Sequence, residues 1–185
     1  MKIPKTVKLE NNPALLAVAE PVQSSQCAEL ARALDQALRR SGYPAGIALP
    51  QLGVALKGFV ISGHIAVQGP RRHRYCFNSE FFFDELSGTT LQAEECLSLP
   101  GKTYYVSRYV RIMADYMNED GQHIQEELHG RLARVYAHEH DHTQGILISD
   151  PRRAKMPKLD VNMQPVKARL AADEITQRII ASQSS

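Results

Sequence analysis

Apolar side chains recur at helical spacing in three stretches of the chain. The spacing predicts a helix over residues 25–42, where the recurring positions are Cys27, Leu30, Leu34 and Leu38. A second helix is predicted over residues 130–145, with Leu132, Val135, Tyr136 and Glu139 at three- and four-residue steps. A third amphipathic segment follows Pro165, and its apolar face consists of Leu170, Ala171, Ile175 and Ile179.

Other stretches show the two-residue period of β-strands. Apolar and polar positions alternate through "YVRIMADYM", the segment "NEDG" predicts a turn, and "QHIQEEL" predicts the returning strand of a hairpin. The runs "KGFVIS" and "RYCFN" also read as strands, whereas the Gly- and Pro-punctuated segment 43–54 reads as a loop. Strands gathered around a helix with polar residues predict an α+β domain.

Charge and cysteine content narrow the classes of protein. The chain has 185 residues with 22 Lys and Arg against 20 Asp and Glu, and this balance argues against a general nucleic-acid binder. We expect no membrane segment, because no apolar run approaches the ~20 residues that cross a bilayer. We expect no signal peptide, because residues 1–13 lack its apolar stretch. The three cysteines are too few and too widely spaced for a disulfide framework, which favours a reducing cytoplasm.

The stretch "AHEHDHTQGIL", beginning at Ala137, carries the clearest chemistry. Residues four apart share one face of a helix, so His138 and His142 point the same way, with Glu139 at the side of that face. His140 lies on roughly the opposite side. In such an H-E-x-x-H pattern the two histidines bind a metal ion and the glutamate acts as general base. The competing interpretation is two exposed, inert histidines. The other histidines are expected at the surface or in loops: His64, His73, His123 and His129.

Two histidines leave a catalytic metal site one protein ligand short. The metzincin pattern would require a third histidine where the chain has Ile148, and the only glutamate after Glu139 is Glu174, near the chain end. The third ligand is therefore expected upstream, and Cys96 stands in the unusual context "AEECLSLPG". Cys27 and Cys76 are expected to be ordinary buried thiols.

Three stretches in this order resemble the signature motifs of peptide deformylases. They are "GIALPQ" (46–51), "EECLS" (94–98) and "HEHDHTQG" (138–145), against the family's G-x-G-φ-A-A-x-Q, E-G-C-L-S and H-E-x-D-H-L-x-G, where φ is apolar. The resemblance covers about residues 1–150. It implies antiparallel β-sheets packed around a central helix that carries H-E-x-x-H. Residues 1–150 would form the catalytic part, and residues 151–185 a basic loop and C-terminal helix of the same domain.

The resemblance also implies roles for individual residues. The implied metal ligands are Cys96, His138 and His142, for Fe(II) or for Zn, Ni or Co as substitutes. The implied catalytic groups are Glu139 as acid and base, and Gln51 with the backbone N–H of Leu97 as oxyanion donors. Gly46 and Ile47 would line the substrate cleft as a strand-like edge. The implied reaction removes formyl from the N-terminal formyl-methionine of nascent peptides in the cytoplasm and releases formate. The basic segment Arg152–Lys155 is either a ribosome-docking surface or a solvated loop.

The chain also departs from the family motifs. The differing positions are Pro44, Leu49, Glu95, Ala137 and Thr143. Glu95 either adds a carboxylate beside the metal ligand or points to solvent, and Asp141 is either a partner of the ligands or a charge on the helix surface. Two alternatives to deformylation therefore stay open: another metal amidase or peptidase with a reshaped cleft, and a non-catalytic relative that binds metal or peptide. Retention of Glu139 argues against the second.

Overall fold

The computed structural model describes residues 11–42, 44–65, 72–83 and 87–151. The chain divides into two compact units, Met1–Ala154 and Lys155–Ser185. The second unit lies outside the described residues. The helix expected after Pro165, its place in the same domain and the segment Arg152–Lys155 therefore stay predictions.

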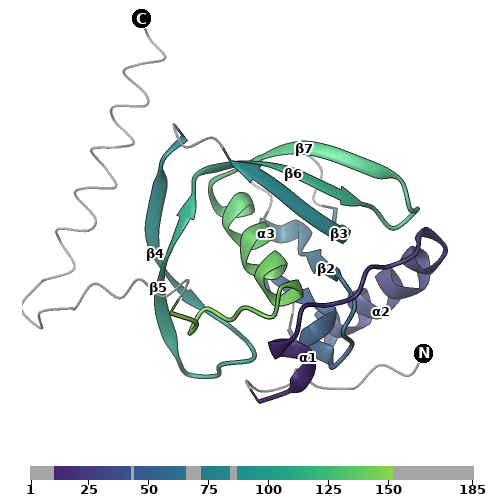
Figure 1. Cartoon of the computed structure of the whole chain (residues 1–185), viewed down its shortest axis with the longest axis horizontal. Helices are drawn as coiled ribbons and strands as arrows, with labels where there is room; N and C mark the ends of the chain where they lie inside the picture. Colours follow the sequence, from purple (N-terminus) through teal and green to yellow (C-terminus); the bar gives the residue numbers. More distant parts are fainter. Residues whose placement is uncertain (1–10, 43, 66–71, 84–86, 152–185) are drawn as a thin grey trace, which may run out of the picture. The chain divides into compact units, whose positions relative to one another are not determined.

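In the described ranges, seven strands form two antiparallel sheets (Figure 1). The larger sheet has the order β1-β2-β3-β6-β7, with strands β1 (Gly46–Ala48), β2 (Gly58–Ile61), β3 (Arg74–Phe83), β6 (Arg111–Met117) and β7 (His123–His129). The smaller sheet is a hairpin of β4 (Thr89–Glu95) and β5 (Thr103–Tyr109). Among the described residues, strand β1 pairs only with β2, so one side of this strand is an edge of the larger sheet.

Helices α2 (Cys27–Arg40) and α3 (Gly130–Thr143) cover opposite faces of the larger sheet. Successive strand residues point to opposite faces. Accordingly, Ile47 and Val60 pack against α2, whereas Ala48 and Phe59 pack on the side of α3. The short helix α1 (Pro13–Leu16) and three 3₁₀ turns complete the described elements: η1 (Ser24–Gln26), η2 (Leu49–Leu52) and η3 (Gly63–Ile65).

Helix α3 occupies the middle of the domain, with the β4–β5 hairpin along one side (Figure 1). A third apolar cluster lies at this side and includes Cys96, Leu99, Val106 and Leu147. After α3 the chain turns at Gly145, whose φ is 67°. A side chain at this position would meet the backbone of Ala17 at 2.9 Å, so the turn requires glycine.

The predicted α+β class with antiparallel sheets around a central helix is confirmed. Two of the three expected helices, those over residues 25–42 and 130–145, and the hairpin of residues 109–128 are present with ends within a few residues of the prediction. The loop predicted over residues 43–54 was wrong in part, because it contains β1 and η2. Strands β4 and β5 were not predicted. Strand β4 buries the charged Glu94 and exposes Leu91, which inverts the usual alternation. No helix in the described ranges is long and apolar enough to cross a membrane.

Candidate metal centre and active site

Three side chains from two elements converge beside α3. His138 and His142 lie one helical turn apart with ring centroids 5.1 Å from each other, and Cys96 follows directly after β4. The potential ligand atoms of Cys96, His138 and His142 all lie within 4.8 Å of one another. Cys96 Sγ is 3.4 Å from His142 Nε2. A cysteine sulfur with two imidazoles is a donor set that suits Zn(II) or Fe(II).

His140 turns away from this cluster, as the helix geometry predicted. It is nevertheless buried, and its Nδ1 lies 3.0 Å from Ser79 Oγ on β3. The expectation of surface or loop positions holds for all four: His64, His123 and His129 are exposed, and His73 is half-buried in the loop just before β3. Cys27 and Cys76 are buried free thiols, as expected, and burial raises the pKa of each.

Glu139 is buried next to the histidines and lies against β1. Burial raises the pKa of its carboxyl to about 7, although His138 and Arg108 act in the opposite direction. Its Oε2 atom has no hydrogen-bond partner in the described part of the chain. A Cβ atom on Gly46 would come within 2.6 Å of Glu139 Oε1, so the carboxylate fits only because this residue is glycine. A carboxyl that titrates near neutrality is suited to take up and return a proton.

Gln51 points its amide nitrogen toward the cluster. Its Oε1 accepts a hydrogen bond from the Ala48 N–H at 2.9 Å, which fixes the orientation of the amide. The Nε2 atom lies 3.6 Å from Cys96 Sγ and 3.3 Å from Ser98 Oγ. Leu97 follows Cys96 and is 41% exposed. The structure therefore brings Gln51 and Leu97 to the same place as Cys96.

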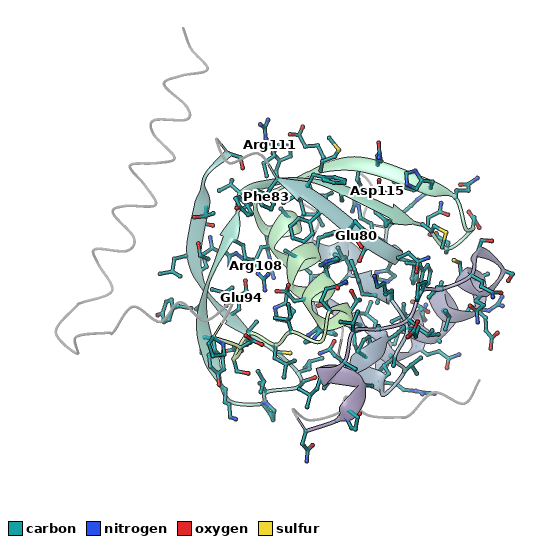
Figure 2. The ribbon with its side chains drawn as sticks, viewed as in Figure 1. Glu80, Phe83, Glu94, Arg108, Arg111 and Asp115 are labelled. Atoms are coloured by element: carbon teal, nitrogen blue, oxygen red, sulfur yellow. The ribbon has the colours of Figure 1, made fainter. Side chains whose placement is uncertain are left out.

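A network of charged side chains holds His138 through its Nδ1 atom. His138 Nδ1 donates to Glu94 Oε2 at 3.0 Å. Arg108 donates to both oxygens of Glu94, at 2.7 and 3.0 Å, and to Asp141 Oδ2 at 2.8 Å. Figure 2 shows Arg108 and Glu94 side by side between the β4–β5 hairpin and α3. Asp141 is buried in this network, which decides against its being a charge on the helix surface.

The electrostatics of this network set the protonation of the two histidines. Burial would raise the pKa of Glu94, but hydrogen bonds from His138 and Arg108 hold this pKa well below its ordinary value. Burial would lower the pKa of His138, but contacts with Cys96 and Glu94 raise it to about 10. Burial lowers the pKa of His142 well below its ordinary value. In the metal-free protein His138 therefore carries a proton that an ion would displace, whereas His142 is neutral.

An ion fits this arrangement for two reasons. Because His138 Nδ1 is engaged by Glu94, its other ring nitrogen is left for a ligand, which is the usual arrangement of a metal-bound histidine with a carboxylate partner. The unpartnered Oε2 atom of Glu139 is a buried acceptor beside the cluster, and buried polar groups without a partner are rare unless a bound group serves them.

Two arginines in this network were missed by the sequence reading. Arg108 gave no signal, because β5 was not predicted. Arg134 lies four residues before His138 and therefore on the same face of α3, so its spacing offered a signal. It is buried and donates to Glu94 Oε1 at 2.6 Å.

The departures from the family motifs lie mostly outside the cluster. Glu95 is exposed and accepts a hydrogen bond from Thr103 Oγ1 at 3.2 Å, so its side chain points to solvent. Leu49 is fully buried in the core shared with α2. Pro44 precedes β1. The Thr143 hydroxyl donates a hydrogen bond of 2.7 Å to the His140 carbonyl.

Comparison with known proteins identifies the family. The profile of the polypeptide deformylase family matches residues 4–158. A peptide deformylase of Thermotoga sp. (strain RQ2) is 38% identical over 109 residues, which are 57% of this chain and 60% of that protein. The structure of peptide deformylase from Thermus thermophilus has a TM-score of 0.67 at 34% identity, over 76% of this chain and 81% of that one. A class I type b peptide deformylase from Acinetobacter baumannii, solved with Met-Ala-Ser bound, has a TM-score of 0.68 at 25% identity, over 80% of this chain and 97% of that one. This chain therefore belongs to the polypeptide deformylase family.

Proposed function

We propose that the protein is a metal-dependent hydrolase that removes the formyl group from the N-terminal formyl-methionine of nascent peptides and releases formate. The observation that carries the proposal is Glu139, buried with a pKa of about 7 and with one oxygen unpartnered among the described residues, beside Cys96, His138 and His142. A pure metal store has no need of such a base. The Acinetobacter relative with Met-Ala-Ser bound supports a substrate that begins with methionine.

A divalent ion held by Cys96, His138 and His142 would polarise the formyl carbonyl and make a water molecule more acidic. Fe(II) is the proposed native ion, with Zn, Ni or Co as substitutes. Glu139 takes the proton of the attacking water and later delivers it to the departing amine. Gln51 Nε2 and the Leu97 N–H donate to the oxygen on which negative charge develops, a contribution often worth ~2.7–4 kcal/mol per donor.

The edge of β1 is the proposed docking strand for the peptide. Gly46 and Ile47 lie in this edge strand, and Gly46 contacts Glu139. A peptide that extends along a sheet edge is held by backbone hydrogen bonds, which tolerate varied side chains. This mode of binding suits an enzyme that must accept many nascent chains.

The proposed place of action is the cytoplasm. All three cysteines are free in the structure, which suits a reducing compartment. The ribosome stays a proposed partner through the basic segment Arg152–Lys155.

One assay tests the reaction against its closest rivals. Purification without oxygen, followed by metal analysis, gives the bound ion. Formyl-methionyl, acetyl-methionyl and unmodified peptides of one sequence are then compared. We expect formate release from the first peptide only. Cleavage of the acetylated peptide or of internal peptide bonds would point to a different amidase or peptidase. Metal binding without any turnover would indicate a binding protein.

A further inference from the structure

Arg134 connects α3 to both strands of the β4–β5 hairpin. Its Nη1 donates to Glu94 Oε1 at 2.6 Å and to the Val106 carbonyl at 3.0 Å. Its Nη2 donates to the Thr90 carbonyl at 2.6 Å and to Thr90 Oγ1 at 3.0 Å. One buried guanidinium thus makes four hydrogen bonds to residues that are 28 to 44 positions away in the sequence.

Burying a charged guanidinium at this position costs free energy, and packing alone would not require it. Burial lowers the pKa of Arg134, which reflects the penalty of removing its charge from water. An apolar side chain of similar length would fill the space without this penalty. The guanidinium provides hydrogen bonds of fixed geometry, because its planar set of donors fits only one arrangement of the acceptors around it.

The metal cluster depends on how β4 lies against α3. His138 and His142 belong to α3, whereas Cys96 follows β4, and the two sheets share no strand in the described part of the chain. Within the described residues, therefore, no ladder of backbone hydrogen bonds sets the distance between the sulfur and the imidazoles. Arg134 holds β4 at its second and sixth residues, Thr90 and Glu94, and the second of these stands two positions before Cys96.

We propose that Arg134 is a positioning residue that clamps β4 to α3 and so holds Cys96 at ligand distance from His138 and His142. The inference rests on the metal site of the proposed function but not on the reaction performed there. It differs from a purely stabilising role, in which loss of Arg134 leaves metal affinity unchanged. It also differs from a purely electrostatic role through Glu94, in which any positive side chain would serve.

Three variants of the full chain separate these roles. Arg134→Met keeps an apolar side chain of similar length and removes all four hydrogen bonds. Arg134→Lys keeps the charge, but its single nitrogen cannot reproduce the planar set of donors. Arg131→Met is the matched control, because Arg131 is an exposed arginine of the same helix and its loss removes the same charge. Circular dichroism first verifies that each variant is folded at the assay temperature.

The probe is Co(II), added to metal-free protein in competition with a chelator. Its affinity and the sulfur-to-cobalt charge-transfer band, which reports coordination by Cys96, are both measured. We expect Arg134→Met and Arg134→Lys to bind Co(II) about tenfold or more weakly and to show a weakened band. Arg131→Met should match the wild type. Thr90→Ala removes one of the four hydrogen bonds, and we expect its Co(II) affinity to lie between those of the wild type and Arg134→Met. This variant tests the proposal even if Arg134→Met does not fold.

The clamp is overturned if Arg134→Met keeps wild-type affinity and band while only its melting temperature falls. It is also overturned if Arg134→Lys binds as the wild type does, because charge alone then suffices. A wild-type protein that binds no Co(II) overturns the metal site, and with it both the proposed function and the clamp. A wild type that binds the ion but releases no formate removes only the deformylation.

Discussion

Glu139 is the residue on which turnover should depend most. Its carboxyl is buried, has a pKa of about 7 and keeps one oxygen unpartnered within the described chain. Glu139→Gln preserves the shape but removes the carboxylate that can accept and return a proton. We expect this variant to bind as much metal as the wild type and to lose about 10²–10⁴-fold in kcat with a formyl-methionyl peptide. Near-normal turnover with normal metal content would exclude Glu139 from the mechanism.

Gly46 sets the position of that carboxylate. A methyl group here would approach Glu139 to between 2.6 and 2.8 Å, so Gly46→Ala must displace the acid. A displacement of about 1 Å can cost up to about 100-fold in rate. We expect kcat to fall by this order while metal content is unchanged, as measured by formate release and metal analysis.

A double variant tests whether displacement of Glu139 is the cause. If Gly46 acts through Glu139, the loss in Gly46→Ala/Glu139→Gln should equal the loss in Glu139→Gln alone, because effects on one shared group are not additive. Additive losses would show instead that Gly46 acts on the substrate directly.

Leu49 belongs to the packing of elements and not to the cleft. It lies in the core between α2 and the sheet, and a Cβ atom on Gly58 would meet its Cδ1 at 2.8 Å. Leu49→Ala, which restores the family's residue, should therefore leave a cavity and lower the free energy of unfolding by about 2–5 kcal/mol. Urea unfolding measures this loss. An unchanged stability would mean that the core closes around the smaller side chain.

The bond between Glu94 and its partners should make the hairpin sensitive to acid. The pKa of the Glu94 carboxyl in the folded protein is depressed below the ordinary 4.5. The stability that this carboxylate contributes is therefore present above pH 4.5 and is lost as the pH falls toward the depressed pKa. We expect the free energy of unfolding of metal-free protein to fall more steeply between about pH 5 and about pH 3 in the wild type than in Glu94→Gln. Equal slopes would show that other carboxylates dominate acid unfolding.

The elements that the sequence predicts well are those whose apolar faces agree with their burial. Helix α2 and the β6–β7 hairpin bury one regular face each. Helix α3 shows the regular spacing in its first half, but its second half is buried on all sides. Strand β4 could not be predicted in this way because its buried face carries the charged Glu94, which pairs with Arg108 on β5. The proposed metal ligands on α3 follow from a four-residue spacing. The Arg108 and Arg134 contacts do not, since they depend on how a strand that was not predicted packs against that helix.

At the scale of the molecule, a bound ion would act as a cross-link. It would join α3, through His138 and His142, to the segment after β4, through Cys96, in a place where the described sheets share no strand. An ion that binds only the folded chain stabilises it by about 2.7 kcal/mol at 100 times its dissociation constant. For a domain of this size that corresponds to about 5–10 °C in melting temperature.

Removal of the ion therefore tests the site without any assay of activity. We expect a chelator to lower the melting temperature of the wild type by about this amount, and added Zn(II) or Co(II) to restore it. Cys96→Ser supplies the control, because an ion held by two imidazoles alone should bind too weakly to leave a difference between chelated and loaded samples. Cys27→Ala and Cys76→Ala should retain the wild-type difference, since both thiols are buried away from the cluster. If the chelator leaves the wild type unchanged while metal analysis shows the ion has gone, the ion does not join these elements.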